Sequence, residues 1–152
     1  MVQLNDADSG VNISSLSNGS ILFIWSIRAW VQAAYQQQCV VRTLYPPYQQ
    51  HNRVDAITTL DECMSVLCAC AYRPVSIRSP HTESLSSDEY ALVEVLQALQ
   101  RGQDRIAESK LKPLVAGRLN NTFRRVAQEY VSRMQTASLN FSGMRHLRLV
   151  KS

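Results

Sequence analysis

Three cysteines lie close together in the sequence, and cysteine thiolates at short spacing are common ligands of structural zinc. They are Cys63, Cys68 and Cys70, and they fall within a segment that is predicted to be one helix. Successive helix residues turn by about 100°, so the side chains of Cys68 and Cys70 point about 200° apart. Cys63 and Cys70 share a face but lie about 10.5 Å apart along the axis, too far for two thiolates on one zinc ion. We therefore predict small buried or half-buried thiols, and no metal or other cofactor.

The histidines and the paired carboxylates match no catalytic motif. His81 lies near Glu83 in a predicted loop and could act as a base, but no nucleophile stands beside it in the sequence. The acid pairs at 61–62 and 88–89 fit helix starts or solvated faces better than acid–base catalysis. The chain also lacks the glycine-rich phosphate loop and the zinc-protease and serine-hydrolase motifs. We expect a protein without catalytic activity; an enzyme would need a pocket that these motifs do not describe.

Charge is distributed unevenly along the chain. Residues 1–100 carry five Lys/Arg and nine Asp/Glu, a net charge of −4, whereas residues 101–152 carry eleven and three, a net charge of +8. A basic third of this kind can attract phosphate or an acidic protein. It can equally pair with the acidic part of its own chain.

The candidate binding residues lie on, or just before, a basic helix predicted at 119–137. Its polar side carries arginine and glutamine side chains that are expected to face water. The predicted binding residues are Arg118, Arg124, Arg125, Gln128 and Arg133.

Two kinds of partner are compatible with this basic surface. The helices on either side of Gly102, followed by the arginine-bearing helix, resemble a helix-turn-helix, which would imply nucleic-acid binding through phosphate contacts. The connections fit the tight turn of such a motif poorly, however, and Pro113 disturbs the middle helix. A protein partner is therefore the first prediction, and nucleic acid is the alternative.

Hydrophobic residues recur at helical spacing through most of the chain and indicate an all-α fold. Ser86 to Glu89 has the S-x-x-E form of a capping box, which predicts a helix start at Ser86 or Ser87. Short connections favour antiparallel neighbours. We predict a compact antiparallel bundle of about five helices, at 21–44, 53–72, 86–102, 104–116 and 119–137.

Prolines set several predicted boundaries. Pro46-Pro47 is expected to end the first helix, and Pro113 is expected to kink or break the fourth. Residues 74–80 alternate between apolar and polar and are predicted to form a short extended strap across the outside of the bundle.

The first predicted helix has a polar stripe and an aromatic side. Arg28, Gln32 and Gln36 recur every four residues and are expected to face solvent. The aromatic residues could fill the core or supply a subunit interface, which makes a homodimer a further prediction. They are Phe23, Trp25, Trp30 and Tyr35.

The chain is predicted to contain one domain. Residues 1–19 are polar and aperiodic, which indicates a flexible arm; residues 20–139 form the helical domain, and residues 140–152 form a basic tail. The apolar run at 21–35 is interrupted by Ser26 and Arg28 and is shorter than the ~20 residues that a bilayer requires. With no signal sequence, we expect a cytoplasmic interaction or regulatory module that binds a protein or itself.

Overall fold

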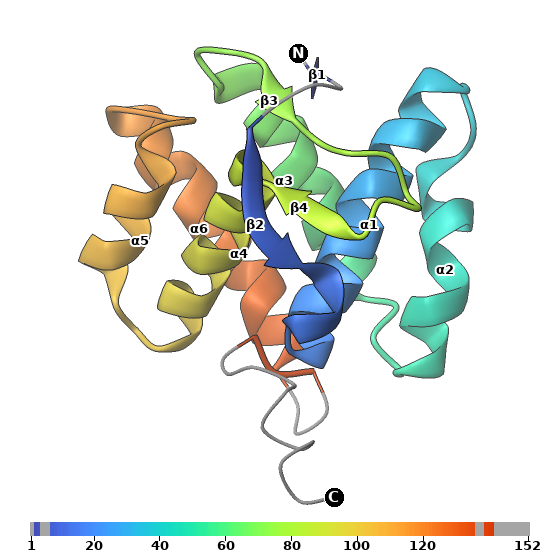
Figure 1. Cartoon of the computed structure of the whole chain (residues 1–152). Coiled ribbons are helices and arrows are strands. Elements are labelled where there is room, and N and C mark those ends of the chain that lie inside the picture. The colour runs from blue at the N-terminus through green and yellow to red at the C-terminus, as the bar shows by residue number, and fades with distance from the viewer. Residues whose placement is uncertain (1, 4–6, 136–138, 142–152) are drawn as a thin grey trace, which may run out of the picture.

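The computed structural model describes residues 2–3, 7–135 and 139–141, which form six α-helices and two pairs of short strands (Figure 1). The mostly helical fold predicted from the sequence is confirmed, whereas the antiparallel order of the bundle stays a prediction. The helices are α1 (Asn18–Tyr35), α2 (Val40–Gln50), α3 (Ala56–Cys70), α4 (Ser87–Gln100), α5 (Asp104–Leu111) and α6 (Arg118–Met134). A short 3-10 turn, Ile13–Ser15, precedes α1.

The strands join segments that are far apart in the sequence. β1 (Val2–Gln3) runs parallel to β3 (Val75–Ser76). β2 (Asp8–Asn12) runs antiparallel to β4 (Ser84–Ser86). Both pairs connect the N-terminal segment to the segment between α3 and α4.

The first predicted helix is two helices, and its predicted end at the prolines is wrong. The backbone turns after Tyr35, where Gln37 has a φ of 55°, and α2 then continues through Pro46 and Pro47. A proline inside a helix costs about 3 kcal/mol, because it removes a hydrogen bond and crowds the preceding turn. Leu44 and Tyr48 of α2 are both completely buried, and this tertiary packing offsets the local cost.

The helices α3, α4, α5 and α6 begin within three residues of their predicted starts, and α3 and α4 end within two residues of their predicted ends. The predicted end of the last helix at 137 lies outside the described residues. Ser86 caps α4 as expected: its hydroxyl accepts from Glu89 N, and the Glu89 carboxylate accepts from Ser86 N. α5 ends at Leu111, two residues before Pro113, so the predicted early break is confirmed.

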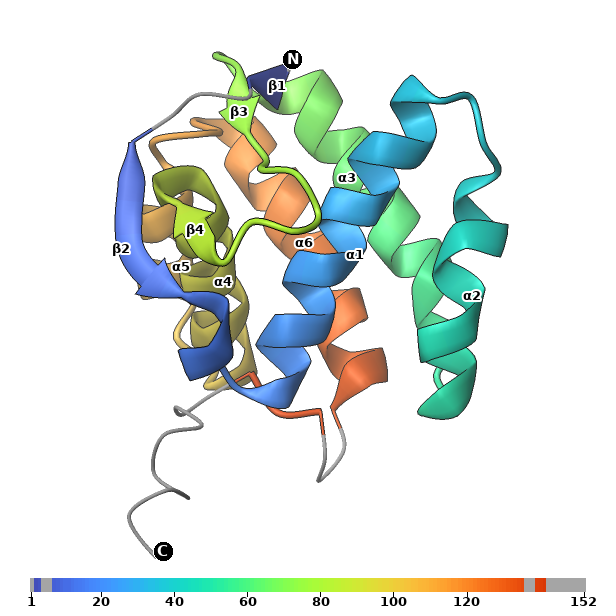
Figure 2. The same cartoon turned by 45° about the vertical axis from the view of Figure 1, so that its right-hand side comes forward.

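The helices pack around one hydrophobic core, with α2 and α5 on opposite flanks (Figures 1 and 2). α3 lies along α6, and α4 packs against α5. A chain of buried hydroxyls ties three helices together inside this core. Ser26 Oγ is 2.8 Å from Tyr48 Oη, which is 2.8 Å from Tyr130 Oη.

The strap between α3 and α4 contains the extended pair Val75–Ser76, as predicted, and its course across the outside of the bundle stays a prediction. Val75, Ser76 and Ile77 are buried. Asp88, in the first turn of α4, accepts from Ser76 N at 2.8 Å and pairs with Arg73 at 2.8 Å. A first-turn carboxylate is stabilised by the helix dipole, and here it also satisfies a strap amide that burial would otherwise leave without a partner.

Arg28 does not face solvent, so this prediction is wrong, although the other two members of the predicted stripe are exposed. Its guanidinium donates to the Glu89 carboxylate at 2.8 and 2.9 Å. It also donates to the carbonyls of Thr82 and Ser84. A buried cation requires such a set of partners, because burial without them would be prohibitively costly.

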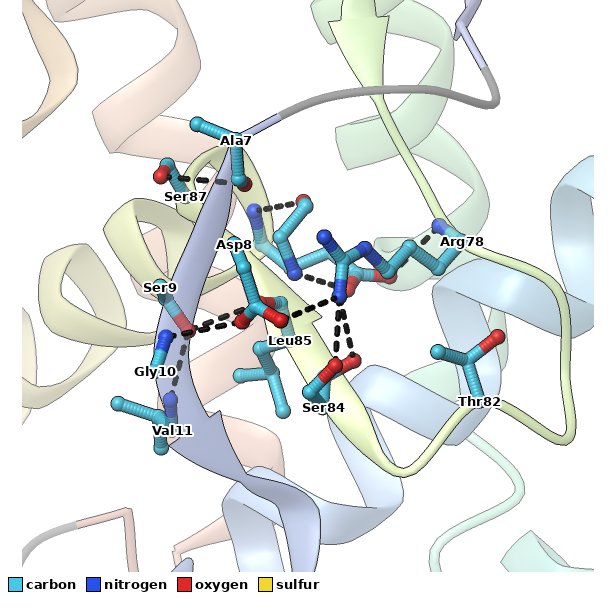
Figure 3. Close-up of polar contacts among 12 residues, drawn as sticks. Ala7, Asp8, Ser9, Gly10, Val11, Arg78, Thr82, Ser84, Leu85 and Ser87 are labelled. Atoms are coloured by element: carbon cyan, nitrogen blue, oxygen red, sulfur yellow. Dashed lines mark hydrogen bonds and ion pairs between the residues drawn. The ribbon is translucent and has the colours of Figure 1, made fainter.

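The N-terminal segment lies over the strap. Figure 3 shows the Arg78 guanidinium between Asp8 of β2 and Ser84 of β4, at 3.6 Å from the Asp8 carboxylate and 2.6 Å from Ser84 Oγ. Ser9 Oγ also donates to Leu85 O at 2.8 Å. Residues 8–12 of the predicted arm therefore have regular structure, while the flexibility of 1–19 and the domain limits stay predictions.

The segment 139–141 packs against the start of α1. Gly19 N donates to Asn140 O at 3.0 Å, and the buried Phe141 lies against Tyr130, with ring centroids 6.0 Å apart. A Cβ at position 19 would lie 2.7 Å from Asn140 O, so the close approach requires glycine there. The rest of the predicted basic tail lies outside the described residues.

Within the described residues, no helix has both the length and the hydrophobicity that crossing a bilayer requires.

Candidate functional site

An open groove with a volume of about 310 Å³ lies along α6. This volume is at the lower end of the range of ~300–1,000 Å³ that is typical of ligand pockets. α4 contributes Leu99, and α5 contributes Asp104. The lining residues from α6 are Asn121, Arg124, Arg125, Gln128 and Glu129.

Helical periodicity places the α6 residues on one stripe. Positions 121, 124, 125, 128 and 129 follow the spacing of adjacent turns, so their side chains lie one above another. The α4–α5 turn supplies the other wall. Gly102, with a φ of 72°, ends α4 and lets α5 fold back, which brings Leu99 and Asp104 to the same groove.

Arg124 is held by a buried asparagine one turn earlier. Its Nε donates to Asn120 Oδ1 at 2.7 Å. Asn120 is only 1% exposed, and its Nδ2 donates to Val115 O at 2.9 Å and to Glu108 O at 3.1 Å. The Asn120 side chain therefore holds the Arg124 guanidinium in place and links α6 to α5 and to the loop that follows α5.

The two groove arginines carry charge that the described part of the chain does not neutralise by contact. Within that part, no carboxylate oxygen lies within 4.0 Å of Arg124 or Arg125. Glu129, in contrast, lies 3.7 Å from Arg133. The groove therefore presents two cations, one paired carboxylate and Asp104.

Three of the five predicted binding residues line this groove: Arg124, Arg125 and Gln128. The other two do not. Arg118 is exposed outside the groove, and Arg133 donates to Asp55 O at 2.8 Å, so part of its donor capacity is used within the chain. A binding role for all five remains a prediction.

Four groove residues were not among the predicted site residues. Asn121 and Glu129 share the helical stripe with Arg125, so their spacing was a usable signal. Leu99 and Asp104 come from other helices, and no local pattern shows that they meet α6.

A second, smaller hollow of about 170 Å³ lies between α1 and the strap. Its lining residues include Arg28, Tyr35, Ile77 and Pro80. The Arg28 guanidinium is already bound by Glu89 and by two carbonyls. This hollow is smaller than a typical ligand pocket and offers less free charge than the groove.

The aromatic residues of α1 do not form one exposed patch. Phe23 is buried, and Trp30 is partly buried, with its indole N–H donating to Asp61 at 2.8 Å. Trp25 and Tyr35 are exposed, but ten positions of helix place them about 15 Å apart along the axis and roughly 80° apart around it. The predicted homodimer gains no continuous interface from this helix.

Three groups with raised pKa values lie in the core, while Cys68, whose pKa is also raised by desolvation, is exposed. Burial raises the pKa of Tyr48 to about 12 and also raises the pKa values of Tyr130 and Cys63. None of these groups lines the groove. Within the described residues, no cluster of three His, Cys, Asp or Glu side chains could hold a metal ion, and all four cysteines are free thiols.

No protein-family model, curated protein or solved structure matches this chain.

Proposed function

We propose that this protein is a small helical interaction module that binds an acidic segment of a partner protein in the α6 groove. The observation that supports the proposal is the pair Arg124 and Arg125, which line a hollow and have no carboxylate within contact distance in the described part of the chain. Charge-assisted hydrogen bonds to arginine are among the strongest polar contacts that a protein makes.

The composition of the groove favours a protein segment over nucleic acid. Asp104 and Glu129 line it together with the arginines, and a protein segment can place a neutral or basic side chain beside these carboxylates, whereas a run of phosphates places negative charge along the whole groove. A protein that makes about 6–10 phosphate contacts needs a larger basic surface than these two arginines provide. Arg133, which would extend the basic surface along α6, is partly engaged within the chain.

The residues that line the groove also indicate which side chains a partner segment would need. A glutamate or aspartate would bind Arg124 and Arg125, an apolar side chain would pack on the small exposed part of Leu99, and a basic or amide side chain would suit Asp104. Such a mixture of one apolar contact and a few directed polar contacts is typical of peptide-sized sites. This function requires no cofactor and no catalysis, and it agrees with the expected cytoplasmic location.

A selection from a random peptide display library tests the proposal and does not require the partner to be identified first. The wild-type protein should enrich peptides with two or more acidic residues beside an apolar one. The variant Arg124→Gln/Arg125→Gln should lose that enrichment while keeping the wild-type circular dichroism spectrum. Enrichment that is the same for both proteins would contradict the proposal, as would a preference for basic peptides.

Two further measurements separate the alternatives. A DNA or RNA duplex that displaces the selected peptides, with an affinity that falls steeply with salt, would favour the nucleic-acid alternative. A dimeric mass by light scattering that the same double variant converts to a monomeric mass would identify a second copy of this chain as the partner.

A further inference from the structure

We infer that Asn120 is the positioning residue of the α6 groove, and that it orients Arg124 so that both terminal nitrogens of the guanidinium can meet one carboxylate of the partner. This inference rests on the proposed function, because it assigns different roles to the two arginines of the same groove.

The orientation of the Asn120 amide is determined by its surroundings. Its NH₂ group faces two backbone carbonyls, Val115 O and Glu108 O, at 2.9 and 3.1 Å. A carbonyl oxygen only accepts, so the nitrogen of the amide must point to these two groups and the oxygen must point to Arg124. Burial removes water as a competing partner.

The anchor leaves a defined part of Arg124 available. Nε is used by Asn120 at 2.7 Å, and the described residues offer no hydrogen-bond acceptor to Nη1 or Nη2. Those two nitrogens form one end of the planar fork that matches a carboxylate in two-point geometry. Long side chains lose rotamer freedom on binding, so a side chain that is already held loses less.

Arg125 is a natural comparison, because it lines the same groove but has no such anchor within the described residues. It is exposed. Arg125 supplies only a positive charge to the bound carboxylate, so the ammonium group of a lysine can replace it. Arg124 supplies two donors in a fixed planar arrangement, which a lysine cannot reproduce.

The matched variants Arg124→Lys and Arg125→Lys test this difference, since both keep the charge. Arg124→Lys also removes the donor to the buried Asn120 Oδ1, so thermal denaturation checks that this variant keeps the fold. The probe is the end-blocked peptide Glu-Glu-Leu-Glu-Glu, with its Gln-Gln-Leu-Gln-Gln form as control, measured by fluorescence anisotropy. We expect Arg124→Lys to weaken binding about 10-fold or more, the loss of one strong charge-assisted hydrogen bond. We expect Arg125→Lys to weaken it less than about threefold.

Side-chain NMR of the free protein tests the anchor independently of any ligand. The Arg124 Nε–H proton should exchange slowly with water in the wild type. In Asn120→Ala it should exchange quickly, so that its signal is lost, and the Arg125 Nε–H proton should exchange quickly in both proteins. If Asn120→Ala does not fold, the lysine pair and the wild-type exchange rates still decide the question.

The outcomes distinguish the two claims. Equal losses for Arg124→Lys and Arg125→Lys, with tight binding by the wild type, would overturn the positioning role and leave the proposed function intact. A wild-type protein that does not prefer the acidic peptide to its glutamine form would overturn both. Fast exchange of the Arg124 Nε–H in the free protein would overturn the positioning role alone.

Discussion

Arg28 of α1 and Glu89 of α4 form a two-point ion pair, with donor–acceptor distances of 2.8 and 2.9 Å and side chains only 1% and 0% exposed. Each partner also holds the strap. Arg28 donates to Thr82 O and Ser84 O, and the Glu89 carboxylate accepts from Ser86 N and Arg78 N. The pair therefore positions the segment that carries β3 and β4 against the helices.

Glu89→Gln should destabilise the fold strongly. The amide leaves the Arg28 guanidinium buried without a counter-charge, and breaking a buried pair in this way costs about 3–5 kcal/mol. Glu94→Gln is the matched control on the same helix: its pair with Lys110 at 3.2 Å is partly exposed, so its loss should cost less than ~1 kcal/mol. Urea denaturation of the two variants measures the difference, and similar losses would refute the structural role of the buried pair.

The buried tyrosines should make the protein sensitive to alkali. Burial raises the pKa of Tyr48 to about 12 from 10.0 and also raises that of Tyr130, so the unfolded chain loses these protons at a lower pH than the folded one. The stability that these groups contribute is fully present below pH 10 and falls as the pH rises towards about 12. The slope in this window is about 1.4 kcal/mol per pH unit for each group.

The variant Tyr48→Phe/Tyr130→Phe tests this pH dependence. It should be less stable than the wild type at neutral pH, because the hydrogen bonds to Ser26 and between the two phenols are lost. Its unfolding free energy should nevertheless decline less steeply above pH 10. Parallel declines for the two proteins in denaturant titrations would show that the buried phenols do not titrate in this way.

Gly19→Ala should detach the segment 139–141 from α1. The added Cβ would lie 2.7 Å from Asn140 O and 2.8 Å from Leu139 O, both backbone atoms, and such overpacking typically costs about 1–3 kcal/mol. Chymotrypsin should then cleave after Phe141, which is buried in the wild type, much faster.

Gly102→Ala is the control for that variant. It adds the same methyl group at a position with a φ of 72° and open space around it, so it incurs the backbone cost of about 1 kcal/mol without crowding Phe141. Equal cleavage rates after Phe141 in the two alanine variants would show that the close approach at position 19 does not hold the segment.

Much of the helical fold was predictable because its signals are local. The capping box at Ser86 and Glu89 and the break before Pro113 each depend on a few neighbouring residues. The errors arose where distant residues decide the outcome. Arg28 has the same spacing as an exposed residue, and its partner Glu89 lies 61 positions away. α2 runs through its prolines because of the tertiary burial of Tyr48.

The candidate site was likewise predictable only where its residues lie on the same helix. Arg124, Arg125 and Gln128 share one helix, so periodicity brought them together in the prediction. The sequence could not show that Asn120 is buried and accepts a hydrogen bond from Arg124. Nor could it show that Arg133 bonds to the carbonyl of Asp55, 78 positions earlier.

Binding of an acidic protein segment in the α6 groove is tested most directly by comparing two double variants. Arg124→Gln/Arg125→Gln removes the groove cations, and Lys112→Gln/Arg118→Gln removes the same charge at two exposed positions outside the groove. We predict that the first variant binds the Glu-Glu-Leu-Glu-Glu peptide about 10-fold or more weakly, and that the second stays within about threefold of the wild type. Equal losses in the two variants would show that general positive charge, and not the groove, attracts the peptide.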